Sequence, residues 1–190
     1  MLYRKDTSVI RELFNSGDVF AYPTEAVWGL GCDPFNEAAI KKVLQIKSRP
    51  AHKGLIIVTG QIKWVEPLLL ALPTYCQDQA KSLWPGPETL IVPDPQGYFN
   101  SLIKGDHDSV AIRVSAHPFI RWFSDNIGPF LVSTSANMSG QAPCRHSWQV
   151  SKRLSHKVNY IVKGRTSGGL QPSRITHLLT GDTLRALSAE

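Results

Sequence analysis

The sequence of 190 residues is long enough for one domain with its own hydrophobic core. Hydrophobic residues make up 42% and charged residues 19%, which is typical of a folded globular protein and excludes a disordered chain. The formal net charge of +6 favours an anionic partner, either a nucleotide or a nucleic acid. The basic residues are scattered and no RNA-binding signature accompanies them, so charge alone does not choose between these partners.

Three further features concern the cellular compartment. The longest apolar run, Leu68–Leu72, is too short to span a membrane. The first residues lack the apolar stretch of a secretory signal peptide. The three cysteines, Cys32, Cys76 and Cys144, lack the spacing of metal ligands. We therefore expect a cytoplasmic protein with reduced thiols, no membrane association and no protein-held metal site.

Hydrophobic periodicity and turn residues predict the order of elements. In the first half we expect a helix over 7–16, a strand over 19–22, a helix over 36–47, a strand over 55–58, helices over 61–70 and 74–82, and a strand over 89–92. In the second half we expect a long polar loop over 93–108, a strand over 109–114, a helix over 117–127, a strand over 130–132, a helix over 147–154, and strands over 159–162, 173–178 and 183–187. Asn36 is expected to cap the second helix, and Thr74 with Gln77 to form a capping box. This alternation predicts an α/β fold with a mixed sheet.

One predicted strand changes character abruptly. Its apolar residues 130–132 are followed by Ser133, Thr134, Ser135, Asn137 and Ser139. Small hydroxyls and an amide at the carboxyl end of a strand are typical of ligand sites in open α/β sheets. The alternative is a Ser/Asn-rich turn that only caps the next element.

Cations gather after the predicted helix that ends at Lys47. Arg49 and Lys53 follow it in the loop before the next strand. The preference of cations for helix C-termini explains Lys47, but Arg49 and Lys53 lie beyond the last turn. A guanidinium fork beside an ammonium group is a common arrangement for binding phosphate oxygens.

Two other stretches leave alternatives open. Residues 23–31 predict a binding loop with two glycines, or else a hairpin turn that holds Trp28 in the core. Arg113 lies in a predicted strand among apolar neighbours, so it needs an anionic partner. That partner is either a ligand or one of the chain's own carboxylates.

Five motifs together resemble the YrdC/TsaC family of threonylcarbamoyl-AMP synthases. In order they are Tyr22-Pro-Thr-Glu-Ala, Lys47-Ser-Arg-Pro, Trp84-Pro-Gly-Pro, Val110-Ala-Ile-Arg-Val with His117-Pro118, and Ser133-Thr-Ser-Ala-Asn-Met-Ser-Gly. Each motif is weak alone, but five in order are specific. The resemblance covers nearly the whole chain and implies one YrdC-like domain over residues 1–190. That domain would be a twisted α/β sheet with a concave, positively charged groove.

The resemblance also implies an activity. Family members combine L-threonine, bicarbonate or CO2, and ATP into threonylcarbamoyl adenylate and diphosphate. Mg²⁺ is expected as the companion of ATP. The product serves the modification of a tRNA adenosine beside the anticodon, reached directly or through a threonylcarbamoyl-transferase complex. Two alternatives remain: a tRNA- or double-stranded-RNA-binding module without catalysis, and a carbamoyl-adenylate module like those of hydrogenase-maturation enzymes.

The family's site residues are carried over by motif. Those expected to bind ATP are Lys47, Arg49, Lys53, Ser109, Ser135, Asn137, Pro143 and Arg185. Those expected to bind threonine are Thr24, Arg113, Ser133 and Ser173. Arg113 would face the threonine carboxylate.

This chain departs from many relatives at several positions. Ala26 and Trp28 replace a threonine and a tyrosine of the first motif. Val58 falls where long-form relatives have a histidine, and Ser173-Arg174-Ile175 falls where they have Ser-Thr-Val. The sequence ends at Glu190, before the extra C-terminal domain of long-form relatives. We therefore expect the short TsaC type.

Overall fold

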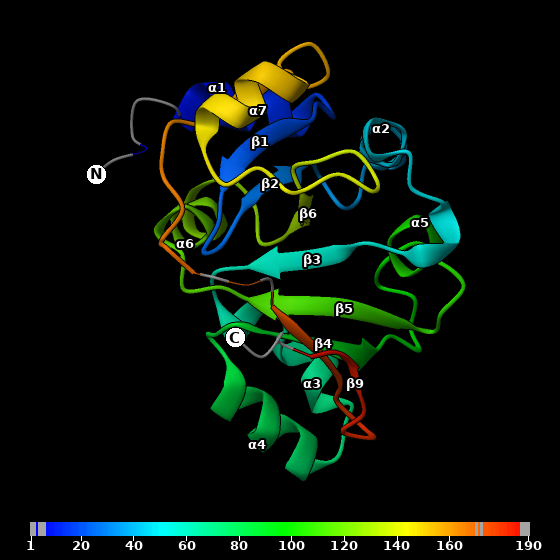
Figure 1. The fold of residues 1–190 in the computed structure, drawn as a ribbon. Coiled ribbons are helices and arrows are strands. Elements are labelled where there is room, and N and C mark those ends of the chain that lie inside the picture. The colour runs from blue at the N-terminus through cyan, green and yellow to red at the C-terminus, as the bar shows by residue number, and fades with distance from the viewer. Residues whose placement is uncertain (1–2, 4–6, 170, 172, 187–190) are drawn as a thin grey trace.

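In the part of the chain that the computed structural model describes, residues 3, 7–169, 171 and 173–186, nine strands form one twisted sheet (Figure 1). The strands are β1 (Phe20–Pro23), β2 (Trp28–Gly31), β3 (Ile56–Thr59), β4 (Glu88–Pro93), β5 (Ser109–Val114), β6 (Leu131–Ser135), β7 (Tyr160–Ile161), β8 (Arg174–His177) and β9 (Thr183–Arg185). Their order is β7-β1-β2-β6-β3-β5-β4-β8-β9. The pairs β1–β7, β3–β5 and β4–β8 are parallel and the other neighbours are antiparallel. The predicted mixed α/β sheet is confirmed.

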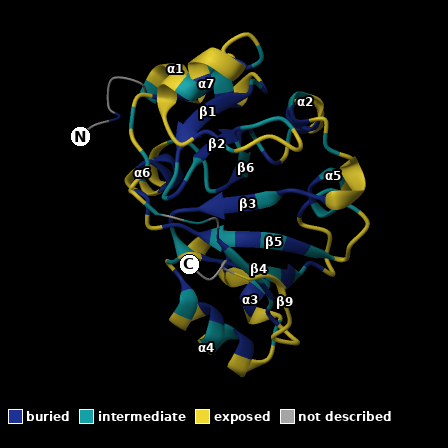
Figure 2. Ribbon diagram, viewed as in Figure 1, coloured by how far each residue is buried: buried dark blue, intermediate teal, exposed yellow. Residues whose placement is uncertain are grey.

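Helices cover the sheet so that several of its strands are buried on both faces (Figure 2). They are α1 (Thr7–Asn15), α2 (Glu37–Lys47), α3 (Glu66–Leu70), α4 (Thr74–Leu83), α5 (Ser101–Lys104), α6 (Pro118–Asn126) and α7 (Ser147–Leu154), with 3₁₀ turns η2 (Ala51–Lys53) and η3 (Ile62–Trp64). Successive strand residues point to opposite faces. Phe20 and Tyr22 of β1 therefore pack on the aromatic rings of α6, while Ala21 between them joins the larger core that includes α2.

Several local predictions hold closely. The Asn36 side chain accepts a hydrogen bond from the Ala39 N–H at 3.0 Å and caps α2, which ends at Lys47. The predicted bounds of the strand over 109–114 and the helix over 147–154 match β5 and α7. Alternation on β5 leaves Ala111 and Arg113 on one partly exposed face, as the sequence pattern predicts.

Three local predictions need correction. The capping box in the 74–82 helix is wrong, because Thr74 is already inside α4 and the Gln77 amide donates to the Leu72 carbonyl. The segment 93–108 is not a continuous loop, because Asn100 caps the short helix α5 and Ile103 is buried. The strand predicted over 130–132 extends further, through the hydroxyl residues up to Ser135.

Among the described residues, no helix has both the length and the apolar character needed to cross a bilayer.

Candidate functional site

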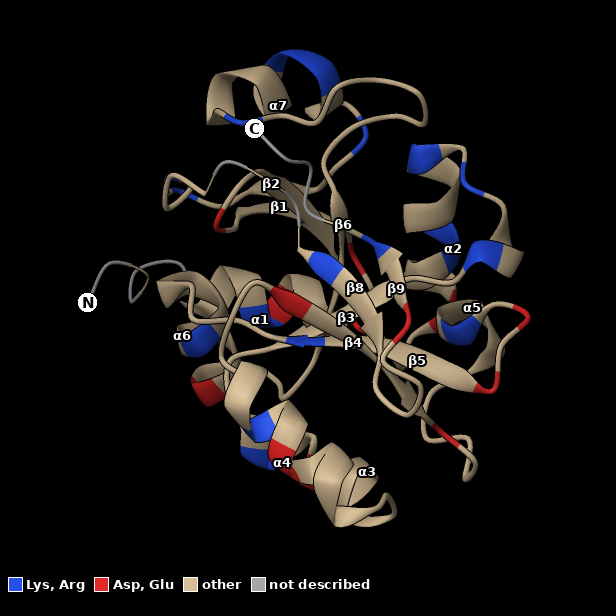
Figure 3. Ribbon diagram, turned by 60° about the horizontal axis from the view of Figure 1, so that its bottom comes forward, with Lys and Arg blue, Asp and Glu red and all other residues tan. Residues whose placement is uncertain are grey.

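A cavity of about 620 Å³ lies over one face of the sheet. All twelve residues expected to bind ATP or threonine line it. Its lining also includes six basic side chains and, among the described residues, no aspartate or glutamate. The six are Lys47, Arg49, Lys53, Lys104, Arg113 and Arg185. Figure 3 shows Lys and Arg on the elements around the cavity, including α2, α5 and β9. Such a lining favours an anionic ligand.

Strand register explains how distant motifs meet in this cavity. Ser133 on β6 is paired with Ile56 on β3, and Ile56 is paired with Ala111 on β5. Cross-strand neighbours share a face, so these residues form a continuous row across the sheet. The hydroxyl residues do lie at the carboxyl end of β6, as predicted. The cavity, however, extends from there across the sheet face, because β6 is antiparallel to both of its neighbours.

One end of the cavity, which we call the Lys47 end, consists of Lys47, Arg49, Lys53, Ser135 and Asn137. The Lys47 ammonium donates to the Ser135 carbonyl at 2.6 Å, and to the Asn137 carbonyl and side-chain Oδ1 at 3.0 and 3.1 Å. Lys47 is only 5% exposed. Burial, followed by the nearby Arg49 charge, lowers the pKa of Lys47 to about 8. The lysine thus holds the Ser-x-Asn segment while facing the cavity.

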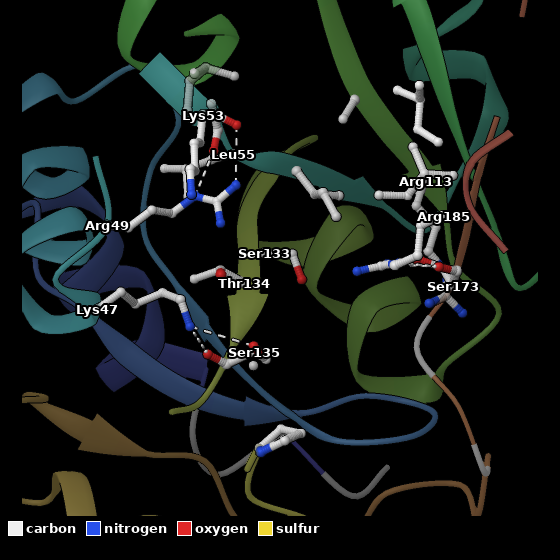
Figure 4. Close-up of a pocket in the computed structure, with 18 of the residues that line it drawn as sticks. Lys47, Arg49, Lys53, Leu55, Arg113, Ser133, Thr134, Ser135, Ser173 and Arg185 are labelled. Carbon is white, nitrogen blue, oxygen red and sulfur yellow. Dashed lines mark hydrogen bonds between the residues drawn. The ribbon is translucent and has the colours of Figure 1, made fainter. Parts of the chain in front are cut away.

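The loop after α2 presents the other two cations of this end. Arg49 Nε donates to the Gly54 carbonyl at 3.0 Å and Nη2 donates to the Lys53 carbonyl at 3.1 Å, as Figure 4 shows. Burial lowers the pKa of Arg49 without removing its charge at neutral pH. Gly54 has φ +57°, and a Cβ there would lie 2.7 Å from the Ile103 carbonyl oxygen. Only glycine therefore fits this turn, which anchors Arg49.

The opposite end, which we call the Arg113 end, consists of Glu25, Arg113, Ser133, Ser173 and Arg185. Figure 4 shows Arg113, Ser173 and Arg185 together, across the cavity from the lysines. Arg185 Nη2 donates to the Ser173 carbonyl at 2.7 Å. Burial and then the neighbouring Arg113 charge lower the pKa of Arg185. This end is built from β5, β6, β9, the segment before β8 and the turn between β1 and β2.

A smaller cavity of about 60 Å³ adjoins the Arg113 end. All four residues expected to bind threonine line it: Thr24, Arg113, Ser133 and Ser173. The large cavity has room for a nucleotide, whereas this recess has room only for a small group. The four residues expected to bind threonine thus lie together at one end of the site, and Arg185, which was expected to bind ATP, lies at that end as well.

The structural alternatives raised for Trp28 and Arg113 are both observed. β1 and β2 form an antiparallel hairpin, and Trp28 is fully buried. Arg113 forms an ion pair with the chain's own Glu25, with Nη2 and Oε1 3.0 Å apart. Yet Thr24 at the hairpin tip and Arg113 also line the cavity. The β1–β2 hairpin and Arg113 thus have structural roles and also line the cavity.

The candidate set omitted two charged residues of the site. Glu25 lines the small recess, and it stands beside Thr24 in the first quoted motif, where its position was the available signal. Lys104 lines the large cavity from α5 and lies 3.6 Å from the Asp94 carboxylate. Its helix was missed in a segment predicted as a loop, so no pattern placed Lys104 at the site.

Comparison with known proteins agrees with this geometry. Residues 12–187 match the Sua5/YciO/YrdC family model, which is described as "Telomere recombination". The chain belongs to the Sua5/YciO/YrdC family. The chain is 45% identical over 173 residues to the threonylcarbamoyl-AMP synthase of Hahella chejuensis, covering 91% of this chain and 94% of that protein. It is 42% identical over 178 residues to the threonylcarbamoyl-AMP synthase of Marinobacter nauticus, covering 94% of each chain.

A solved structure of the Sua5/YciO/YrdC family shares the fold. The structure of P. abyssi Sua5 complexed with L-threonine superimposes with a TM-score of 0.86 at 28% identity. The match covers 96% of this chain and 54% of that chain, so this chain spans about half the length of the P. abyssi protein. The expected family and its mixed α/β fold are both confirmed.

Proposed function

We propose that this protein is a threonylcarbamoyl-AMP synthase, which makes threonylcarbamoyl adenylate and diphosphate from L-threonine, bicarbonate or CO2, and ATP. One observation carries the proposal: relatives of that name are 42–45% identical over at least 91% of the chain. The site agrees with it, because one cavity joins a cation-rich end to a small recess at Arg113. An RNA-binding module without catalysis would need no such recess.

In this proposal the two ends of the cavity bind different substrates. Arg49 and Lys53 face the triphosphate, with Ser135 and Asn137 held in place by Lys47. Threonine lies at the Arg113 end, so that the carbamate formed on its amine reaches the α-phosphate between the two ends. Attack by the carbamate oxygen on the α-phosphorus forms the P–O bond of the adenylate and expels diphosphate. Catalysis then rests on positioning and on stabilising negative charge.

The predicted role of Mg²⁺ as a companion of ATP is also part of this proposal. Mg²⁺ prefers oxygen ligands and is commonly held through substrate phosphates. The described lining of the large cavity contains serine and threonine hydroxyls but no carboxylate. This donor set fits an ion that arrives with the phosphates rather than one held by a protein cage.

The proposal also includes the reaction that uses the product. A reactive adenylate of this kind would serve the threonylcarbamoylation of a tRNA adenosine beside the anticodon in the cytoplasm. The cavity suits the synthesis of a small molecule, and transfer to tRNA would occur directly or through a threonylcarbamoyl-transferase complex. The protein's contact with tRNA is a separate question, because binding of RNA should weaken steeply with salt whereas adenylate synthesis should not.

The decisive experiment measures diphosphate release from ATP with Mg²⁺, omitting L-threonine and bicarbonate in turn. We expect release to require both. Release in the absence of both, or no release by folded protein, would contradict the proposal. Carbamoyl phosphate in place of threonine and bicarbonate tests the hydrogenase-maturation alternative, and we expect it to support no release.

A further inference from the structure

The Arg113 guanidinium uses only part of its hydrogen-bonding capacity. Nε donates to the Gly86 carbonyl at 3.0 Å, and Nη2 forms an ion pair with Glu25 Oε1, the two atoms lying 3.0 Å apart. An arginine carries five N–H donors. Apart from that ion pair, the four N–H groups of Nη1 and Nη2 have no hydrogen-bond partner among the described residues, and the side chain is 13% exposed in the wall of the recess. Arg113 can therefore bind a ligand carboxylate while its ion pair with Glu25 stays intact.

Only one of the two oxygens of the Glu25 carboxylate has a partner among the described residues. Its Oε1 accepts a hydrogen bond from the Ser115 hydroxyl at 2.7 Å and forms the ion pair with Arg113. Its Oε2 accepts no hydrogen bond from the described residues, and the side chain is 23% exposed in the same recess. A partly buried carboxylate oxygen beside an open space requires a donor, from water or from a ligand.

The backbone around Glu25 is held firmly. The Gly169 N–H donates to the Glu25 carbonyl at 2.8 Å, and the Ser167 N–H donates to the Thr24 carbonyl at 3.3 Å. A Cβ at Gly169 would lie 3.1 Å from the Glu25 carbonyl oxygen. These bonds hold the backbone of the hairpin tip, and the Ser115 hydroxyl and Arg113 hold the Glu25 side chain, as a binding group must be held.

Glu25 differs in charge from the other ionisable side chains of the site. It is the one carboxylate among the described residues that line either cavity. The recess thus offers an open guanidinium and an open carboxylate oxygen side by side. A ligand with a carboxylate alone would use the first and face repulsion from the second. A zwitterion, with a carboxylate and an ammonium group on one carbon, would use both.

We propose that Glu25 is a further substrate-binding residue, whose Oε2 accepts a hydrogen bond from the α-ammonium group of the amino acid while Arg113 binds its α-carboxylate. This inference rests on the proposed function. It makes the Arg113 end selective for α-amino acids over hydroxy acids, and it orients the nitrogen that must later bond to carbon dioxide.

A purely structural role for Glu25 makes a different prediction. If Glu25 only positions Arg113, removing its charge should weaken the binding of every carboxylate ligand equally. If Glu25 binds the ammonium group, only ligands with that group should lose affinity. The probe that separates these roles is 3-hydroxybutyrate, which is threonine without its amino group.

The experiment compares the affinities of L-threonine and 3-hydroxybutyrate for wild-type protein and for Glu25→Gln, by calorimetry or by competition. Gln keeps the size of the side chain and an acceptor for Ser115. Because a hydrogen bond to a charged group is lost, we expect threonine to bind about 10- to 100-fold more weakly to Glu25→Gln. Binding of 3-hydroxybutyrate should stay unchanged or tighten, and the KM for ATP should not change. Glu66→Gln, at an exposed glutamate of α3, is the matched control and should behave as wild type.

The outcomes are distinct. Equal weakening of both ligands, or unchanged threonine binding, would overturn the assignment of Glu25 and leave the proposed function intact. A wild-type protein that binds no L-threonine, with or without ATP, would overturn both. Thermal unfolding of Glu25→Gln near that of wild type shows that a loss of affinity is not a loss of fold.

Discussion

The Lys47 end and the Arg113 end of the cavity are both cationic, but Lys47 and Arg49 have different kinds of partner from Arg113. Lys47 and Arg49 are held by carbonyls, hydroxyls and amides, with no carboxylate in contact with either side chain among the described residues. Arg113 has a carboxylate partner, Glu25. Dipoles position a cation without cancelling its charge, whereas an ion pair cancels much of it.

This difference matches the two kinds of ligand proposed for the ends. A triphosphate carries several negative charges, so an end without carboxylates attracts it most strongly. An amino acid is a zwitterion with no net charge, so an end with both signs suits it better. In the proposed function, the site therefore separates its substrates by net charge as well as by size. The following predictions test that separation, beginning with the largest expected effect.

Lys47→Met should have the largest effect, because Lys47 binds the Ser135 and Asn137 carbonyls and, in the proposed function, the segment it holds faces the triphosphate. Methionine removes the ammonium group that pairs the carbonyls of Ser135 and Asn137. Loss of these hydrogen bonds to partly buried acceptors should cost about 2–3 kcal/mol of unfolding free energy, measured by denaturant titration. Diphosphate release should fall at least about 100-fold, beyond what lost stability explains, since the phosphate-facing segment is no longer held.

A matched control for this prediction is Lys41→Met, on the same helix. Lys41 is an exposed residue whose ion pair with Glu37 spans 3.5 Å, and such surface pairs contribute little. It should retain wild-type activity. Unchanged ATP kinetics in Lys47→Met would mean that Lys47 has no part in binding phosphate or in holding the segment that does.

Arg113→Gln should affect threonine and leave ATP binding almost unchanged. The substitution removes the charged donor for a ligand carboxylate and leaves Glu25 without its ion-pair partner. We expect the KM for L-threonine to rise about 10- to 100-fold, in keeping with the loss of one charge-assisted hydrogen bond. The KM for ATP should stay within about twofold. A comparable rise in both constants would show that the two ends do not act separately.

Most of the fold could be predicted from the sequence, and the twelve candidate residues do line the cavity, but the contacts among them could not be predicted. Asn36 and the alternation on β5 are local signals, and both predictions held. The bonds that organise the site join residues far apart: Lys47 to Ser135, and Arg113 to Glu25, are each 88 positions apart. Such contacts depend on strand order and register, which hydrophobic periodicity does not specify.

The Lys47 end should also respond to pH in a way that the Arg113 end does not. The pKa of Lys47 is lowered to about 8 by burial and then by Arg49, whereas the unfolded chain keeps a value near 10.5. Between these values the unfolded state binds the extra proton, so folding stability should rise with pH, by at most about 3 kcal/mol. The KM for ATP should rise over the same range, because the ammonium charge is lost.

Comparison with Lys47→Met isolates this effect from other groups that titrate above pH 8. The stability difference between wild type and variant should change between about pH 8 and 10, and the KM for threonine should not follow it. A constant difference across this range would show that Lys47 keeps its proton, held by the carbonyls around it.

Asn36→Ala should have the smallest effect. It tests whether the stability of α2 affects ATP binding at the Lys47 end. It removes the hydrogen bond that the Ala39 N–H donates to the Asn36 side chain, at the opposite end of α2 from Lys47. Loss of an N-cap should reduce the unfolding free energy by about 1 kcal/mol, and Asn36→Ser should restore most of it. The KM for ATP should stay constant in both variants, because Lys47 and its carbonyl partners are fixed by tertiary contacts rather than by the helix start. A rise in the KM for ATP that Asn36→Ser reverses would instead show that helix stability itself controls the Lys47 end.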